Sequence, residues 1–81
     1  MSQDPRERVH DLDVTVWVGK GGIEPVVAEL SDQLGERDLV KAKFLRAARG
    51  ETTTDELAGE LADRTSAEVI DVRGHTAVFR R

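Results

Sequence analysis

A glycine-rich segment around a single cation, Gly19-Lys20-Gly21-Gly22, is the part of this 81-residue sequence best suited to binding chemistry. Glycine permits positive φ values and lets another backbone approach closely. Main-chain N–H groups beside one ammonium group suit a phosphate, and KH-type modules use Gly-x-x-Gly against the backbone of single-stranded nucleic acid. Taken alone, the spacing is more typical of a tight turn that needs glycine only for its geometry.

Other chemical motifs do not fit. A Walker loop needs a longer spacing and a hydroxyl after its lysine, and the dinucleotide pattern Gly-x-Gly-x-x-Gly would require glycine where Glu24 stands. The absence of cysteine excludes disulfides, thiolate metal sites and cysteine nucleophiles. His10 and His75 are too far apart to suggest a metal site. No serine lies in a nucleophile motif. From these observations together we expect no catalytic residues, no metal and no cofactor.

The glycine segment joins a predicted strand to a predicted helix. Residues 14–18 alternate with period two, which places three valines on one face and Thr15 and Trp17 on the other. Apolar residues from 23 to 34 form one helical stripe, and Gly35 is expected to end this helix in a left-handed conformation. Such a helix would direct its first N–H groups and positive dipole end at the loop.

The rest of the chain predicts a similar alternation of elements. The patterns indicate a strand over 39–45, then a basic connection over 46–51, then a helix opened by a Thr53–Glu56 capping box. A strand over 68–72, a turn at Arg73-Gly74 and a strand over 75–80 follow. The residues expected to face the core are Val40, Ala42, Phe44, Leu57, Ala58, Leu61, Ala62, Ile70 and Val72.

This order predicts a two-layer α/β fold: a four-stranded mixed sheet with both long helices on one face. The element order is β-α-β-α-β-β behind an N-terminal arm or short helix. Residues 1–13 are assigned to the arm and residues 14–81 to one domain.

Charge is unevenly distributed. The formal net charge is −4, but residues 37–49 sum to +4 while the acids concentrate in the two predicted helices. A polyanion responds to local potential, so one basic face is compatible with an acidic chain. The cations that could extend a phosphate-binding surface are Lys41, Lys43, Arg46, Arg49, Arg73 and Arg81. An ordinary solvated sheet face is the alternative reading of the two lysines.

No apolar stretch is long enough to span a bilayer, and no signal-peptide core is present. We therefore expect a cytoplasmic protein without a membrane partner. We also expect a monomer.

From Thr15 to Arg81 the sequence resembles the YhbY-type CRM domain (chloroplast RNA splicing and ribosome maturation), in an archaeal-like stand-alone form. The segments that carry the resemblance are Trp17-Val18-Gly19-Lys20-Gly21-Gly22-Ile23, Val26-Val27-Ala28-Glu29-Leu30, Leu39-Val40-Lys41-Ala42-Lys43 and Gly74-His75-Thr76-Ala77-Val78-Phe79.

The resemblance implies a compact α/β domain related to the C-terminal domain of translation initiation factor 3. It also implies RNA binding, with Gly19, Lys20, Gly21 and Gly22 in the contacting loop, and association with large-subunit ribosome precursors. The N-terminal arm departs from bacterial relatives, whose corresponding helix is longer and basic.

The sequence therefore predicts a non-enzymatic RNA-binding protein acting on ribosomal precursor RNA. One alternative is a protein-interaction module whose acidic helices dock on ribosomal proteins. Another is an enzyme acting on nucleotides. Trp17 is expected to pack against Val9 or Leu12 of the arm, with stacking on a base as the alternative.

Overall fold

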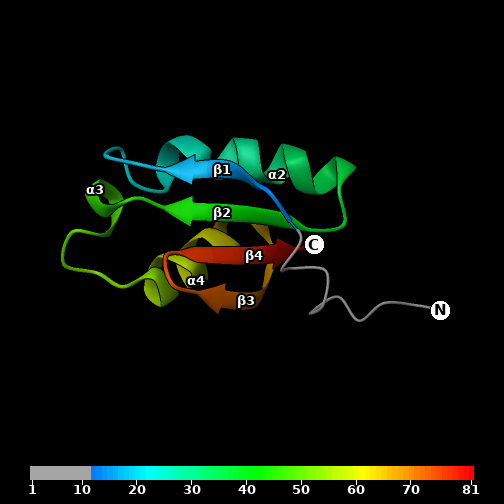
Figure 1. The fold of residues 1–81 in the computed structure, drawn as a ribbon. Coiled ribbons are helices and arrows are strands. Elements are labelled where there is room, and N and C mark those ends of the chain that lie inside the picture. The colour runs from blue at the N-terminus through cyan, green and yellow to red at the C-terminus, as the bar shows by residue number, and fades with distance from the viewer. Residues whose placement is uncertain (1–11) are drawn as a thin grey trace.

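A computed structural model describes residues 12–81 of the chain (Figure 1). Its elements are β1 (Val14–Val18), a 3-10 turn η2 (Glu24–Val26), α2 (Val27–Glu36), β2 (Val40–Phe44), α3 (Arg46–Arg49), α4 (Thr54–Thr65), β3 (Glu68–Arg73) and β4 (Thr76–Arg80). The predicted α/β fold with a four-stranded mixed sheet is confirmed. The predicted N-terminal arm, apart from Leu12 and Asp13, lies outside the described residues.

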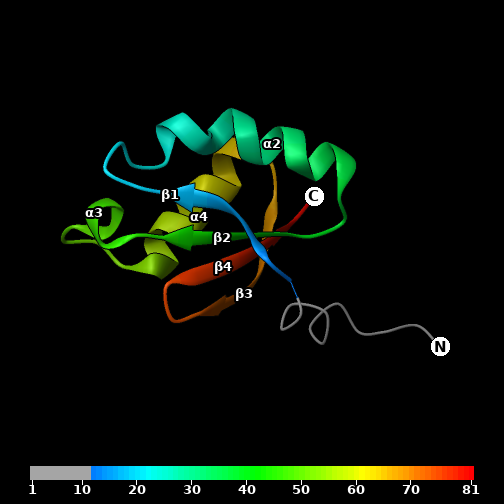
Figure 2. The ribbon, with the colours of Figure 1, turned by 45° about the horizontal axis from the view of Figure 1, so that its top comes forward.

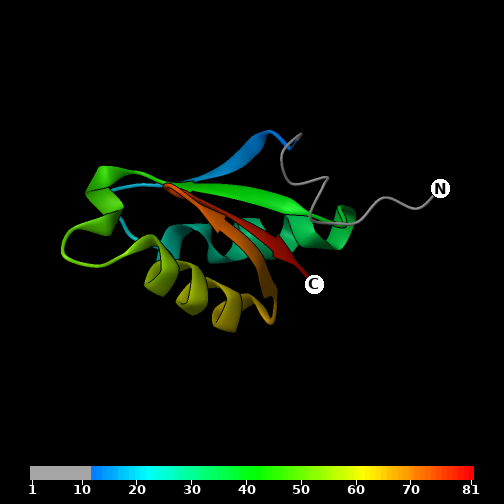
Figure 3. The same cartoon turned by 60° about the horizontal axis from the view of Figure 1, so that its bottom comes forward.

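The sheet has the strand order β1-β2-β4-β3, so the last strand of the chain lies between β2 and β3. β1 and β2 are parallel, whereas β4 is antiparallel to both of its neighbours. Helices α2 and α4 cover the same face, which gives the two layers seen in Figure 3. Within residues 12–81 no helix covers the opposite face, which we call the open face.

The core fills the space between the sheet and the two helices. The fully buried side chains include Phe44 from β2, Phe79 from β4, Leu30 from α2 and Leu61 from α4. Burying a side chain of this size stabilises the fold by about 1.5–3 kcal/mol relative to leaving it exposed. The predicted inward set of α4, from Leu57 to Ala62, is buried as expected.

A bulge in β1 changes the predicted sidedness of that strand. Val14 pairs with Lys41 and Val16 with Ala42, so Thr15 is the extra residue. The Thr15 hydroxyl donates to Oε1 of Gln33 on α2, and Nε2 of Gln33 donates back to the Thr15 carbonyl at 3.2 Å. The prediction that Thr15 shares a face with Trp17 is therefore wrong, because an inserted residue shifts the period-two pattern.

A second bulge overturns the prediction that Ile70 faces the main core. Val69 pairs with Phe79 and Asp71 with Val78, which leaves Ile70 as the inserted residue of β3. Ile70 packs instead with Leu39 and Val78 in a small second cluster. Val69 and Val72 pack against the main core.

The ends of the helices follow the predictions in part. The Thr53 hydroxyl accepts the Glu56 N–H at 3.2 Å, which confirms the predicted N-cap of α4. Gly35 does not end α2 as predicted: the helix continues to Glu36, and Arg37 follows in an extended conformation. The predicted basic connection contains the short helix α3.

Three connections meet at one end of the sheet because β1, β2 and β3 all run toward it. They are the glycine loop after β1, the segment with α3 after β2, and the turn at Gly74 between β3 and β4. Figure 2 shows the first two side by side at this end. We call it the loop end. The C-terminus lies at the opposite end (Figure 1).

Candidate functional site

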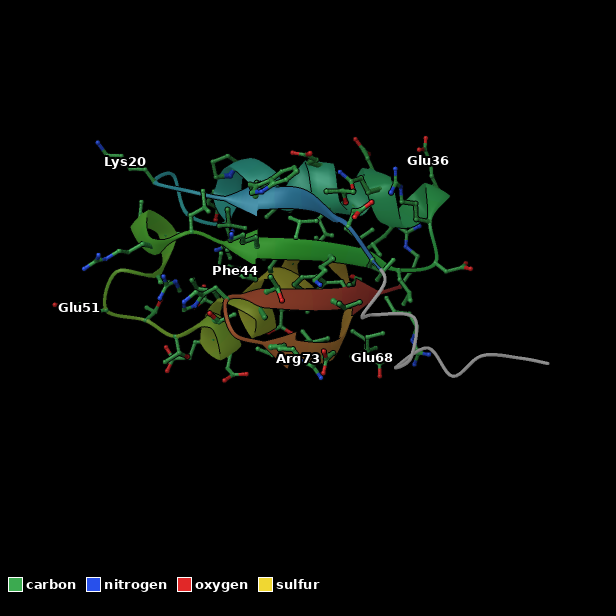
Figure 4. All side chains as sticks on the ribbon, in the orientation of Figure 1. Lys20, Glu36, Phe44, Glu51, Glu68 and Arg73 are labelled. Atoms are coloured by element: carbon green, nitrogen blue, oxygen red, sulfur yellow. The ribbon has the colours of Figure 1, made fainter. Side chains whose placement is uncertain are left out.

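The glycine loop is a closed reverse turn with an exposed tip. The Gly22 N–H donates to the Gly19 carbonyl at 2.9 Å, and Gly22 has a φ of 73°, which a residue with a side chain rarely adopts. Lys20 and Gly21 at the tip are exposed. Figure 4 shows the Lys20 side chain extending away from the body of the protein.

Main-chain donors remain available at this tip. Across residues 12–81, the amides of Lys20 and Gly21 donate to no other protein group. Two adjacent N–H groups and one ammonium group can together hold an anionic oxygen. Contact with a phosphate at this loop stays a prediction from the sequence.

The start of the following helix differs from the expectation. α2 begins only at Val27, because the 3-10 turn η2 separates it from the loop, and the Val26 N–H is already bonded to the Ile23 carbonyl at 3.0 Å. Pro25 within η2 has no backbone N–H that could donate a hydrogen bond. The donors at the loop are therefore those of the turn itself rather than those of the helix end.

Glu24 is the acidic residue nearest the loop in sequence, and its carboxylate is paired. Arg64 of α4 donates to Glu24 Oε1. The two side chains are at least half exposed, so the pair adds little to stability. The positive charge of Arg64 offsets the negative charge of Glu24 close to the glycine loop.

The open face carries a row of polar and aromatic residues across all four strands. Trp17 of β1 pairs with Lys43 of β2, Lys43 with Thr76 of β4, and Thr76 with Arg73 of β3. Trp17 is 55% exposed, and Lys43 and Arg73 are also exposed. This row lies next to the loop end, so the sheet register joins two of the predicted cations to the glycine loop.

Trp17 does not follow the expected packing on Leu12. Leu12 packs with Leu39 and Val78, while Trp17 stays more than half exposed. The other predicted partner, Val9, lies outside the described residues.

Leu45 extends the open face toward the loop, which sequence reasoning did not anticipate. It is 39% exposed, and a Cβ built on Gly19 would lie 3.9 Å from Leu45 Cδ1. The signal was present in the alternation, because Leu45 is two residues after the outward-facing Lys43 and directly follows the buried Phe44.

The remaining predicted cations divide into three groups. Arg46 is exposed on α3 at the loop end, whereas Arg49 is half-buried and its Nε donates to the Phe44 carbonyl at 3.2 Å. Lys41 lies on the open face one row farther from the loop, beside Val14 and Val78. Arg81 lies at the opposite end, where its Nη1 would be 3.8 Å from a Cβ built on Gly35 of α2, and is not brought together with the others.

Acidic side chains are concentrated on the other layer. The exposed acids of α2 and α4 are Glu29, Asp32, Glu36, Asp55, Glu56, Glu60 and Asp63. These acids lie on the surface of the helical layer. The acidic segments of the sequence therefore lie in the helices, and the basic segment lies at the sheet and the loop end. An approaching polyanion would be repelled by the helical layer.

Within residues 12–81 no three His, Asp or Glu side chains lie close enough together to hold a metal ion. In the same part of the chain, no helix has the length and apolar character needed to cross a membrane.

These features define a small α/β domain with one helical face, one open sheet face and an exposed Gly-x-x-Gly loop between them. Residues 2–81 match the CRS1/YhbY (CRM) domain. The chain belongs to this family, as its resemblance to the YhbY-type domain predicted.

Two relatives are informative. The chain is 42% identical over 76 residues to "Probable RNA-binding protein MJ0652" of Methanocaldococcus jannaschii; the match covers 94% of this chain and 57% of that protein. The chain thus spans little more than half the length of this relative. It also matches the solution structure of SAV1595 from Staphylococcus aureus, described as "a putative RNA binding protein", with a TM-score of 0.77 and 31% identity over 94% of this chain and 78% of that one.

Proposed function

We propose that this chain binds RNA without catalysis, through the Gly19–Gly22 loop and the cations next to it. The observation that carries the proposal is the exposed loop tip next to the open-face row that contains Lys43. At this tip the Lys20 ammonium group accompanies two amides that have no partner among residues 12–81. Family membership and the names of both relatives support the same class of ligand.

The proposed contact is with the sugar-phosphate backbone. Lys20 and the loop amides hold one phosphate group, and Lys43 and Arg46 reach neighbouring phosphates along the loop end. Contacts of this kind position a nucleic acid without reading its sequence. The acidic helices keep the polymer on the open face and set its side of approach.

The RNA that we propose is ribosomal precursor RNA during large-subunit assembly, with the chain acting as a cytoplasmic monomer. This finer assignment follows the resemblance to YhbY-type domains. Crosslinking the protein in cells and sequencing the attached RNA tests it: enrichment of large-subunit precursor is expected, and a spread over unrelated transcripts would refute the assignment.

The loop contact itself is tested by charge reversal at Lys20. Lys20→Glu is expected to weaken binding of a single-stranded oligoribonucleotide at least tenfold, while circular dichroism shows an unchanged fold. Arg37→Glu is the matched control, because Arg37 is an exposed cation just beyond the C-terminal end of α2, away from the loop end. Equal affinities for Lys20→Glu and the unmodified chain would rule out the loop mechanism.

The exposed acids of α2 and α4 support one competing function, docking on a basic ribosomal protein. Glu60→Lys in α4 distinguishes the two. Binding through the loop predicts unchanged or slightly tighter RNA binding for this variant. Docking through the helices predicts loss of ribosome association while Lys20→Glu has no effect.

A further inference from the structure

We infer that the open face beside the loop holds an unpaired nucleobase of single-stranded RNA, with Trp17 as its stacking surface. This inference rests on the proposed RNA binding and narrows it to one form of RNA. Its starting point is the position of two side chains: among residues 12–81, the large hydrophobic residues that are exposed are Trp17 and Leu45. Both lie at the loop end.

The strand register places these two side chains on one surface. Val16 and Val18 of β1, like Ala42 and Phe44 of β2, face the helices and are buried. The residues between them therefore face the other way, which puts Trp17 beside Lys43.

The next row toward the loop would be Gly19 beside Leu45. The Leu45 N–H donates to the Val18 carbonyl at 2.9 Å, so the pairing of the strands continues to this row. Gly19 has no side chain, and Leu45 Cδ1 would lie 3.9 Å from a Cβ built there. Trp17 and Leu45 are therefore diagonal neighbours on the open face, and Gly19 places no side chain between them.

Two cations lie close to these residues along the chain or across the sheet. Lys43 is the cross-strand neighbour of Trp17, and Lys20 follows Gly19 directly at the exposed tip. Trp17 and Gly19 are two residues apart, about 6.6 Å along an extended strand. A flat apolar surface with cations this close matches a nucleotide, whose base face is apolar and whose phosphate is anionic.

The surface selects single strands because a base inside a duplex is already stacked on its neighbours. An unpaired base is free to lie on the indole ring of Trp17, while its own or an adjacent phosphate contacts the loop. Stacking of bases on aromatic side chains beside a cationic track is the usual means of holding single-stranded RNA. The proposed site is therefore a base subsite next to a phosphate subsite.

Intrinsic fluorescence isolates this site, because Trp17 is the one tryptophan in the chain and there is no tyrosine. The full chain is titrated with a 12-nucleotide single strand rich in A and U, and in parallel with the blunt duplex of the same strand. Anisotropy of end-labelled RNA measures affinity independently. The inference predicts quenching of Trp17 by the single strand, and at least tenfold weaker binding of the duplex.

Two variants separate stacking from general packing. Trp17→Ala is expected to lower the affinity for the single strand about tenfold, the range found for loss of one stacked base. Trp17→Phe keeps an aromatic face and is expected to retain affinity within about threefold. Because Trp17 is more than half exposed, both variants are expected to fold, which circular dichroism checks.

Three outcomes would overturn the inference while leaving RNA binding by the loop intact. They are full affinity of Trp17→Ala for the single strand, equal binding of duplex and single strand, and a blue-shifted Trp17 emission that RNA does not change. The last result would mean that the chain's own residues cover the indole ring. If neither form of RNA binds the unmodified chain, the proposed function itself fails and the inference fails with it.

Discussion

Gly21 and Pro25 stand so close that a side chain at position 21 would meet the proline ring: a Cβ built on Gly21 would lie 3.0 Å from Pro25 Cγ. The loop tip is therefore held against the first turn of the following helical segment. Glycine at this position avoids a clash with the Pro25 ring and also keeps the loop amides accessible. Substitutions at different glycines of the loop are therefore expected to differ in their effect on stability.

Gly21→Ala is expected to destabilise the fold by about 1 kcal/mol, because a proline ring yields less readily than a flexible side chain. Gly19→Ala is the matched loop variant. Its Cβ would lie at an ordinary contact distance of 3.9 Å from Leu45, so a smaller loss is expected. Urea unfolding followed by circular dichroism measures both; equal stabilities would show that Pro25 moves freely.

Gly59→Ala in α4 is expected to stabilise the protein by about 0.5–1 kcal/mol, the usual difference between these residues in a helix interior. A Cβ at Gly59 would meet no atom within 4 Å outside the helix backbone nearby. Thermal unfolding gives the comparison. A lower midpoint for the alanine variant would show that a neighbour obstructs this position.

Thr53→Ala is expected to cost about 1 kcal/mol, because the Thr53 hydroxyl caps the first turn of α4 by accepting the Glu56 N–H. Thr53→Ser keeps the hydroxyl and should retain most of the stability. Denaturant unfolding of the three proteins tests the cap. An alanine variant as stable as the unmodified chain would show that water replaces the hydroxyl at no cost.

The salt dependence of RNA affinity distinguishes cations that contact phosphate from cations that do not. Removing one phosphate contact is expected to reduce the slope of log affinity against log salt concentration by about 0.7 for a single strand. Lys20→Ala and Lys43→Ala should each show this reduction, and Arg37→Ala should not. Parallel slopes for all four proteins would exclude Lys20 and Lys43 from the contact with phosphate.

Much of the fold could be predicted because local patterns and the final structure agree. The alternation in β2, the helical stripe of α2 and the Thr53 cap each depend on residues within a few positions of one another. The two bulges could not be predicted in this way. An inserted residue such as Thr15 or Ile70 leaves the hydrophobic content unchanged and reverses only the sidedness, which depends on pairing with another strand.

The candidate site was predictable to a similar degree. The loop and Lys43 were identified from spacing and alternation, and the register joins them. The position of Arg81 could not be foreseen, because it depends on β4 entering the sheet next to β2 and running away from the loop end. Likewise, the exposure of Leu45 depends on where β2 ends relative to Gly19.

Amide chemical-shift mapping by NMR, with a short single-stranded oligoribonucleotide added to the full chain, tests RNA contact at the loop most directly. The expected result is that the largest shifts occur at the amides from Gly19 to Gly22, with further shifts at Lys43 and at the indole N–H of Trp17. Shifts confined to α2 and α4, with the loop amides unchanged, would contradict the proposed binding site.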